Sequence, residues 1–138
     1  YIKSVLANAK ILAETLKNNG FKIYSGGTDT HLMLVDLRPF NVKGNLAAES
    51  LSRANITCNK NGIPFDTESP MVTSGIRLGS QVATTRGFGL KEFEKVGELI
   101  TKTIQGLSQN PEDNSKTEKE VRDEVINLCA SFPIYKNL

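Results

Sequence analysis

The chain has 138 residues, which is enough for one domain with its own hydrophobic core. Its 17 basic and 15 acidic residues are interspersed and leave a net charge of +2, which argues against both a nucleic-acid-binding stripe and a polybasic membrane patch. The longest strongly apolar run, residues 32–35, is far too short to span a bilayer.

The first predicted element is a helix. Apolar residues recur every three or four positions from 2 to 19, which predicts an amphipathic helix with one buried face. Gly20 follows this pattern and is expected to end the helix in a left-handed conformation. The helical pattern is already under way at Tyr1, which is not a Met and has no capping residue before it. We therefore expect the chain to be a segment of a longer protein.

Strands and helices then follow in mixed order. Predicted strands lie at residues 21–24, 31–37, 56–58 and 76–78, and a short helix lies at 46–54. Two amphipathic helices come next, one at 90–107 and one that opens with a capping box formed by Thr117 and Glu120. A hairpin combined with several helices predicts an α+β fold, in which a small antiparallel sheet of three to four strands packs against helices.

The two cysteines, Cys58 and Cys129, lie far apart and have no CxxC context. The only histidine is His31, so no group of residues has the spacing of a zinc site, and we expect no metal. Two isolated thiols fit a reducing compartment, and we expect a cytoplasmic protein in which both are buried. We assign no functional role to His31 or Arg86.

The most informative stretch of the sequence surrounds Arg77. Small residues flank this arginine, with Gly75 and Gly79 two positions away on either side. A guanidinium fork on a short strand between glycines can bind a planar carboxylate through two parallel hydrogen bonds. The alternative is a surface arginine that pairs with a nearby Asp or Glu. The segment 59–74 before it is a long predicted loop, which is typical of functional regions.

Three ordered segments carry a family resemblance. They are SGGTDTHLMLVDLRP at residues 25–39, NKNGIPFDTESPMVTSGIR at 59–77, and SGIRLG followed by TTRGFG at 74–89. Together they resemble the C-terminal domain of the serine hydroxymethyltransferases, enzymes that use pyridoxal 5'-phosphate to interconvert serine and glycine with tetrahydrofolate. The resemblance covers nearly the whole chain. It departs from the family at Thr30, Cys58 and Met71, where Asn, Val and Phe are common.

The resemblance implies roles for several residues. In the family, the arginine of the SGIR segment binds the α-carboxylate of the amino-acid substrate, and Arg77 occupies that position. Asn61 matches an asparagine that touches the pteridine ring of the folate. Ser69, Pro70 and Met71 match a segment that lines the folate site. On local features alone, the asparagine is also compatible with an ordinary turn residue, and the three-residue segment with a rigid turn before the strand.

The resemblance also implies what the chain lacks. Residues 1–138 match the C-terminal small domain of a fold-type I pyridoxal-phosphate enzyme, and the large catalytic domain is absent from them. No lysine here has the threonine-rich context of the family's Schiff-base lysine. We therefore expect the cofactor to be bound mainly by the absent domain, and the isolated chain to be inactive and to hold no catalytic residue. The expected full-length enzyme is a homodimer or homotetramer that binds serine or glycine and tetrahydrofolate.

Two alternatives stay open at this point. The chain could be the small domain of another fold-type I pyridoxal-phosphate enzyme, which would also place a carboxylate-binding arginine here. The match to the folate-side segment at residues 59–71 argues against that alternative. The second alternative is a non-catalytic module that binds a carboxylate ligand or a partner protein.

Overall fold

The structure, a computed structural model, describes residues 2–25, 32–79 and 87–131. Its helices are α1 (Ile2–Asn18), the 3-10 helix η1 (Arg38–Phe40), α2 (Gly44–Arg53), α4 (Leu90–Gln109) and α5 (Ser115–Ala130). Its strands are β1 (Lys22–Ser25), β2 (Leu32–Asp36), β3 (Asn59–Asn61) and β4 (Gly75–Gly79). Each helix in the described ranges is too short or too polar to span a lipid bilayer. The predicted α+β fold is confirmed.

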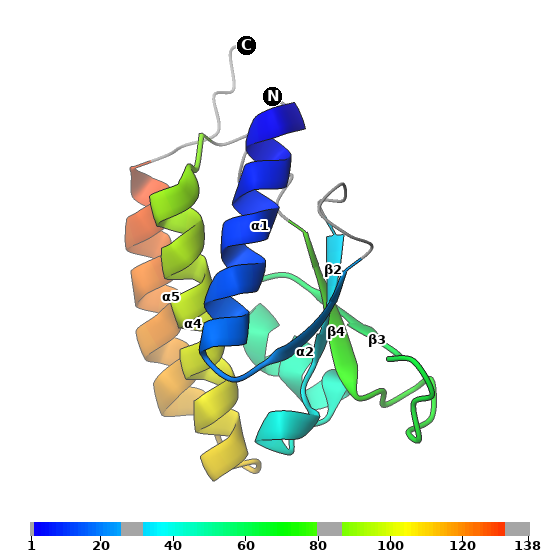
Figure 1. The fold of residues 1–138 in the computed structure, drawn as a ribbon. Helices are drawn as coiled ribbons and strands as arrows, with labels where there is room; N and C mark the ends of the chain where they lie inside the picture. The colour runs from blue at the N-terminus through cyan, green and yellow to red at the C-terminus, as the bar shows by residue number, and fades with distance from the viewer. Residues whose placement is uncertain (1, 26–31, 80–86, 132–138) are drawn as a thin grey trace.

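The four strands form one antiparallel sheet in the order β1-β2-β4-β3. Ile23, Val35 and Ile76 pair across its first three strands and set the register. Figure 1 shows the three long helices, α1, α4 and α5, side by side on one face of this sheet. The predicted pairing of the first two strands is confirmed, and the turn between them lies outside the described residues.

The predicted strand at residues 56–58 is wrong, and the paired segment is β3, which begins directly after it at Asn59. The backbone N–H of Ile56 donates to the carbonyl oxygen of Leu51 at 2.8 Å, so this residue caps the C-terminal end of α2. Ile56 and Cys58 pack against the core as partly buried side chains. These two apolar residues therefore pack the segment between α2 and β3 against the core. Strand pairing starts only at Asn59.

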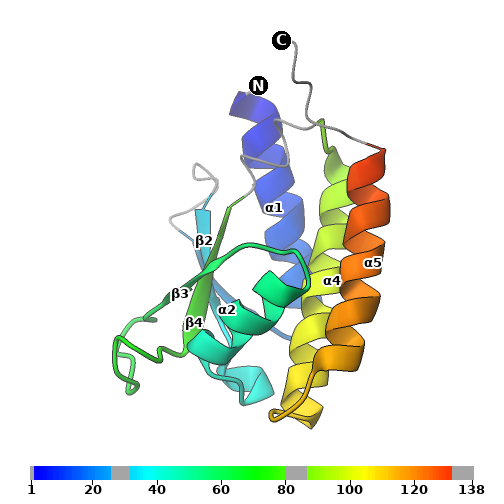
Figure 2. The same ribbon diagram turned by 180° about the vertical axis from the view of Figure 1, so that it is seen from behind.

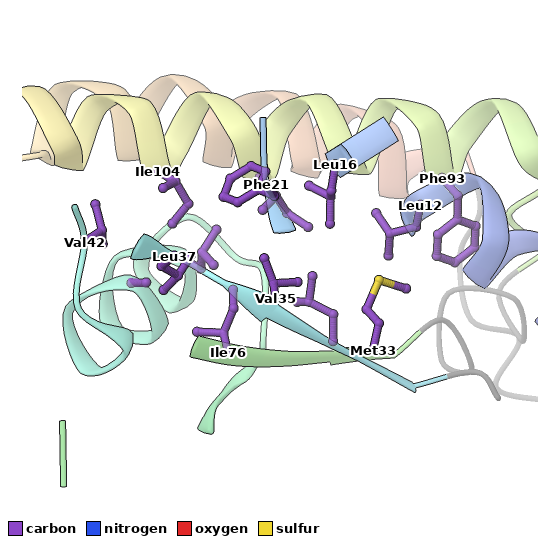
Figure 3. Close-up of a cluster of buried hydrophobic side chains, with 14 of the residues drawn as sticks. Leu12, Leu16, Phe21, Met33, Val35, Leu37, Val42, Ile76, Phe93 and Ile104 are labelled. Atoms are coloured by element: carbon purple, nitrogen blue, oxygen red, sulfur yellow. The ribbon is translucent and has the colours of Figure 1, made fainter. Parts of the chain in front are cut away.

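The hydrophobic core lies between the sheet and the long helices. Figure 3 shows Leu12, Leu16 and Ile104 from the helices facing Val35 and Ile76 from the sheet, and all five side chains are almost completely buried. Burial of one such side chain contributes about 1.5–3 kcal/mol, so this layer is the main stabilising contact of the fold. In the described part of the chain, no helix covers the opposite face of the sheet (Figure 2).

A buried polar network joins α2, α4 and α5. The amide of Asn114 donates to the hydroxyl oxygen of Ser50 and to the backbone carbonyl of Thr103. The Glu118 carboxylate accepts from the Ser50 hydroxyl at 2.6 Å and from the guanidinium of Arg53 at 2.8 and 2.9 Å. Because every member has a partner, the network fixes how the three helices pack together.

The helix α5 begins earlier than predicted. The capping box expected from Thr117 and Glu120 is wrong, because the helix already starts at Ser115. The carboxylate of Asp113 accepts the backbone N–H and the hydroxyl of Ser115 at 3.0 and 2.6 Å and so fixes the entry to the helix. Glu120 instead forms an ion pair with Lys102 on α4 at 3.1 Å.

We expect the contact between α1 and α4 to be sensitive to a single methyl group. A Cβ added at Gly97 would lie 2.7 Å from Cγ2 of Thr15. Overpacking costs about 1–3 kcal/mol, and alanine gains only ~1 kcal/mol over glycine in a helix. Gly97→Ala should therefore lower the free energy of unfolding, measured by urea denaturation. Thr15→Ser removes Cγ2 and should recover part of the loss in a double-mutant cycle. A Gly97→Ala chain that is more stable would contradict this expectation.

Candidate functional site

Arg77 lies on the face of the sheet that the helices leave open. Along β4, the side chains of Ile76 and Leu78 point into the core and are buried, whereas Arg77 between them is exposed. Successive side chains of a strand point to opposite faces, so the strand itself fixes this direction. The prediction that a strand carries Arg77 is confirmed.

The guanidinium of Arg77 has no hydrogen bond or ion pair to any of residues 2–25, 32–79 and 87–131. Two other arginines in the described part form ion pairs, and Arg122 donates to the backbone carbonyl of Arg53. Arg38 contacts Asp36 at 2.8 Å, and Arg53 contacts Glu118 at the same distance. The alternative reading of Arg77 as one half of a surface ion pair therefore finds no partner among the described carboxylates.

The two residues directly opposite Arg77 differ in chemical character. Leu34 on β2 and Asn59 on β3 pair with it, so both side chains lie on the same face as the guanidinium. Tyr24 on β1 pairs with Leu34 and continues this row across the sheet. The surface around Arg77 is therefore apolar on the β2 side and polar on the β3 side.

Asn61 is the last residue of β3 and pairs with Gly75. Its partner Gly75 is two residues from Arg77 along β4. Asn61 therefore lies on the same face of the sheet as Arg77. Its side-chain amide donates to the carbonyl oxygen of Gly62 at 2.9 Å. This bond is the one that an ordinary turn asparagine would make. The amide oxygen has no partner in the described part of the chain and stays available as an acceptor.

The segment 69–71 forms an exposed turn within the loop that joins β3 to β4. The carbonyl oxygen of Ser69 accepts the backbone N–H groups of Val72 and Thr73 at 3.0 and 2.9 Å. Ser69 and Pro70 are exposed, and 73% of Met71 is exposed. The rigid turn expected as the structural alternative is thus present, and it presents an apolar side chain to solvent.

Phe65 is the one aromatic residue of the same loop, which the structure describes in full. Its side chain is fully exposed, and its backbone has a φ of 56°. A left-handed backbone at a bulky residue is unfavourable and points to a functional constraint or to strong support from neighbouring contacts. Figure 2 shows the β3–β4 loop extending away from α1, α4 and α5. Because the ring of Phe65 is fully exposed there, this end of the molecule is open to a ligand or to another part of a protein.

Asp66 holds the loop in place. Its carboxylate accepts the backbone N–H groups of Ile63, Glu68 and Ser74 at 3.2, 2.9 and 2.8 Å, and the hydroxyl of Ser74 at 2.8 Å. Burial raises the pKa of Asp66, but the hydrogen bonds from Glu68, Ser74 and Ile63 lower it more, and the pKa falls to about 2. The carboxylate therefore stays ionised at any pH near neutrality.

Two glycines let the loop approach the rest of the domain. A Cβ at Gly75 would lie 2.8 Å from Cγ2 of Ile63 and 2.9 Å from two backbone oxygens, so only glycine allows Ile63 to pack on the sheet there. A Cβ at Gly44 would collide with the hydroxyl oxygen of Thr73, so glycine is needed at this contact too. Gly44 and Asn45 at the start of α2 donate their backbone N–H groups to the carbonyl oxygens of Thr73 and Val72. The end of the loop thus satisfies donors that a helix start leaves unpaired.

Pyridoxal phosphate, which the resemblance implies, needs a lysine in a desolvated environment for its imine link. The lysines whose side chains the structure describes are exposed, apart from Lys102, which forms ion pairs with Glu120 and Glu124. These residues do not fit the cofactor, and we derive no chemical step through it. Within residues 2–25, 32–79 and 87–131, no group of His, Cys, Asp and Glu side chains could hold a metal ion.

The cysteines have the character of core residues. Cys58 and Cys129 are free thiols, and both are half-buried against the main hydrophobic cluster. Burial raises the pKa of Cys58 to about 11, so this thiol is protonated near neutral pH and is a poor nucleophile. His31 and Arg86 lie outside the described residues.

Two features of the site were missed in the sequence. Asn59 falls in the predicted loop 59–74, although its alternation with Asn61 places both amides on one face once β3 forms a strand. No pattern in the sequence marks Asp66, because its partners are mainly backbone N–H groups, which any residue type supplies.

Comparisons with known proteins agree on one family. Residues 1–100 match the family described as serine hydroxymethyltransferase. A serine hydroxymethyltransferase of Pelagibacter ubique is 86% identical over 100% of the chain. Those of Marinomonas sp. and Paramagnetospirillum magneticum are 62% and 60% identical over 99% of it. Each alignment covers 32% of the relative, so the chain spans about a third of the length of these curated relatives.

We expect Asp66 to make the free energy of unfolding depend on pH in the acidic range. Its folded-state pKa of about 2 lies below the ordinary 3.8, so its contribution is complete above about pH 4 and is lost as the pH falls through about 2. Asp66→Asn places an NH₂ group against backbone donors and should lower the free energy of unfolding by about 1–3 kcal/mol at pH 7. Urea denaturation between pH 7 and pH 2 measures both effects.

Asp123→Asn is the matched control, because Asp123 is exposed on α5. It should leave the unfolding free energy within about 0.5 kcal/mol of the unsubstituted chain, as is usual for surface changes. An Asp66→Asn chain with unchanged stability and unchanged acid dependence would show that this carboxylate does not hold the loop.

Proposed function

This chain belongs to the serine hydroxymethyltransferase family, and we propose that it forms the C-terminal small domain of a full-length enzyme of that kind. That enzyme would interconvert serine and glycine and transfer a one-carbon unit to tetrahydrofolate. In this proposal the chain supplies the arginine that binds the substrate carboxylate and part of the folate site. The observation that carries it is the exposed guanidinium of Arg77, at the family's arginine position and without a partner among the described residues.

The proposed role of Arg77 follows from its geometry. A guanidinium presents five donors in a planar fork, which matches the two oxygens of a carboxylate. Two hydrogen bonds to one carboxylate fix its plane as well as its position. They therefore restrict rotation of the substrate about its Cα, and reactant orientation of this kind is a large part of catalysis. Arg77 is rigidly placed, because its neighbours Ile76 and Leu78 are anchored in the core.

We further propose that Asn61 and the 69–71 turn face the folate. An amide has both a donor and an acceptor, and the edge of a pterin ring offers the complementary groups. The unpartnered amide oxygen of Asn61 and the exposed side chain of Met71 support this role. Met71 would pack against a flat ring through its polarisable sulfur, and Pro70 would hold the turn.

The remaining parts of the activity are assigned to the rest of the full-length enzyme. Binding of pyridoxal 5'-phosphate belongs there, since the described lysines of this chain do not fit it. We propose that the isolated chain is inactive, and that the full-length enzyme is a cytoplasmic homodimer or homotetramer. Family membership disfavours the alternative of another pyridoxal-phosphate family, and the high identity to named enzymes disfavours a non-catalytic binding module.

We expect Arg77→Ala in the full-length enzyme to weaken glycine and serine binding severely. Loss of a charge-assisted bidentate pair in a partly desolvated site costs about 2–5 kcal/mol. Arg77→Lys should recover little of this loss, because an ammonium keeps the charge but lacks the fork. Spectroscopic titration with both amino acids measures the affinities, and the visible absorbance of bound cofactor should persist in both variants.

Lys60→Ala is a suitable control for the loss of a cation from the sheet region, since Lys60 is exposed on β3 and has no ion pair with a described residue. It should leave the affinity for glycine within a few-fold of normal. Near-normal serine affinity in Arg77→Ala would remove this arginine from the site, and with it the main support for the proposal.

For the folate side, we expect Asn61→Ala to raise the Kd for tetrahydrofolate and leave the glycine affinity unchanged. A lost hydrogen bond of about 0.5–1.5 kcal/mol corresponds to a weakening of roughly twofold to twelvefold. Fluorescence titration of the full-length enzyme, saturated with glycine, gives the folate Kd. Asn18→Ala, at an exposed position of α1, is the matched control. Unchanged folate affinity in Asn61→Ala would place this residue outside the folate site.

A further inference from the structure

Asn59 and Arg77 form a polar pair at the edge of the sheet. They lie directly opposite each other in the antiparallel pairing of β3 with β4, where Cβ atoms are about 4.5–5.5 Å apart. Both side chains are exposed. In the part of the chain that the structure describes, neither makes a hydrogen bond or an ion pair with any other residue.

The fold gives no reason for an amide at position 59. Asparagine is disfavoured in strands, because its short polar side chain packs poorly on a pleated surface. Asn61, two residues further along β3, donates to the carbonyl of Gly62, and a turn can use that bond. Asn59 has no comparable bond to any described residue. An amide without an internal role, beside an unpaired guanidinium, points to a ligand that both side chains contact.

The chemistry of a carboxylate fits this pair. A carboxylate accepts about four hydrogen bonds through its two oxygens, and one guanidinium fork supplies two of them. The NH₂ group of Asn59 adds a donor on the β3 side of Arg77. Leu34, the residue opposite Arg77 on β2, offers no polar group. A carboxylate bound to Arg77 therefore accepts more hydrogen bonds when it lies on the β3 side than on the β2 side.

We propose that Asn59 is a second donor to the α-carboxylate of the amino-acid substrate, beside Arg77. This inference rests on the proposed function, because it needs Arg77 to bind that carboxylate. It adds a direction to the site: the carboxylate lies on the side of Arg77 next to β3, and Leu34 borders the opposite side. Asn59 thus favours binding of amino acids over amines that lack a carboxylate.

The test uses the full-length enzyme and spectroscopic titration with glycine, serine and ethanolamine, an amine without a carboxylate. Asn59→Ala should weaken glycine and serine binding by about tenfold to a hundredfold, the range for a hydrogen bond to a charged group. Binding of ethanolamine should change less than twofold. A purely structural role for Asn59 would weaken all three ligands alike, and that result would overturn the inference.

Asn59→Asp sharpens the test, because the side chain keeps its shape but gains a negative charge opposite Arg77. The new carboxylate should pair with the guanidinium and repel the substrate carboxylate, so glycine affinity should fall further than in Asn59→Ala. The control is Lys60→Ala: Lys60 is exposed on the same strand but pairs with Ile76 and so belongs to the other face. It should bind glycine within twofold of the unsubstituted enzyme.

The outcomes separate this inference from the proposed function. If Arg77→Ala loses glycine binding and both Asn59 variants keep normal affinity, Asn59 is not a donor and the carboxylate role of Arg77 stands. If Arg77→Ala also keeps normal affinity, the carboxylate site itself is elsewhere and both proposals fail. Retained cofactor absorbance and an unchanged circular dichroism spectrum establish that each variant is folded. If Asn59→Ala does not fold, Asn59→Ser takes its place in the test.

Discussion

The geometry of the open sheet face depends on the carboxylate of Asp66. Its four hydrogen bonds join Ile63 near the start of the β3–β4 loop, Glu68 in the middle and Ser74 at the end. A loop of this length would otherwise allow several pairings between its two strands, since register is set largely by the connection. With both ends of the loop tied to one side chain, the pairing of β3 with β4 is fixed, and the position opposite Arg77 with it.

The same loop combines a buried base with an exposed tip. Close to the sheet, Thr73 has a left-handed backbone with a φ of 62°, and its hydroxyl donates to the carbonyl of Gly75. Farther out, Phe65 has a similar backbone and a fully exposed ring. Conformations of this kind cost about 1–3 kcal/mol each and persist only where surrounding contacts enforce them. The hydrogen bonds of Asp66 supply that enforcement, so the loop holds its exposed apolar residues in one arrangement.

Sequence patterns predicted the elements whose apolar residues recur regularly. The helices α1 and α4 and the strand β4 were found because each presents a continuous buried face to the core. The strand β3 was missed, since Asn-Lys-Asn at a sheet edge has no apolar alternation to mark it. Arg77 stood out through its flanking glycines and the family resemblance. The position of Asn59 opposite Arg77 could not be predicted in this way, because it depends on a strand register that only the folded loop defines.

Two kinds of arginine in this chain show how environment separates structural from binding roles. Arg38 and Arg53 approach carboxylates whose side chains are almost completely buried, Asp36 and Glu118, and they neutralise charges that could not remain inside the protein alone. Arg77 sits instead where the strand turns it away from the core, next to a leucine and an asparagine, and none of the described carboxylates lies within ion-pair distance. A guanidinium that is already paired would have to break that pair before it could bind a substrate. Leaving Arg77 without an acidic neighbour keeps its full hydrogen-bonding capacity for a ligand, and the rigid strand keeps its position fixed before that ligand arrives.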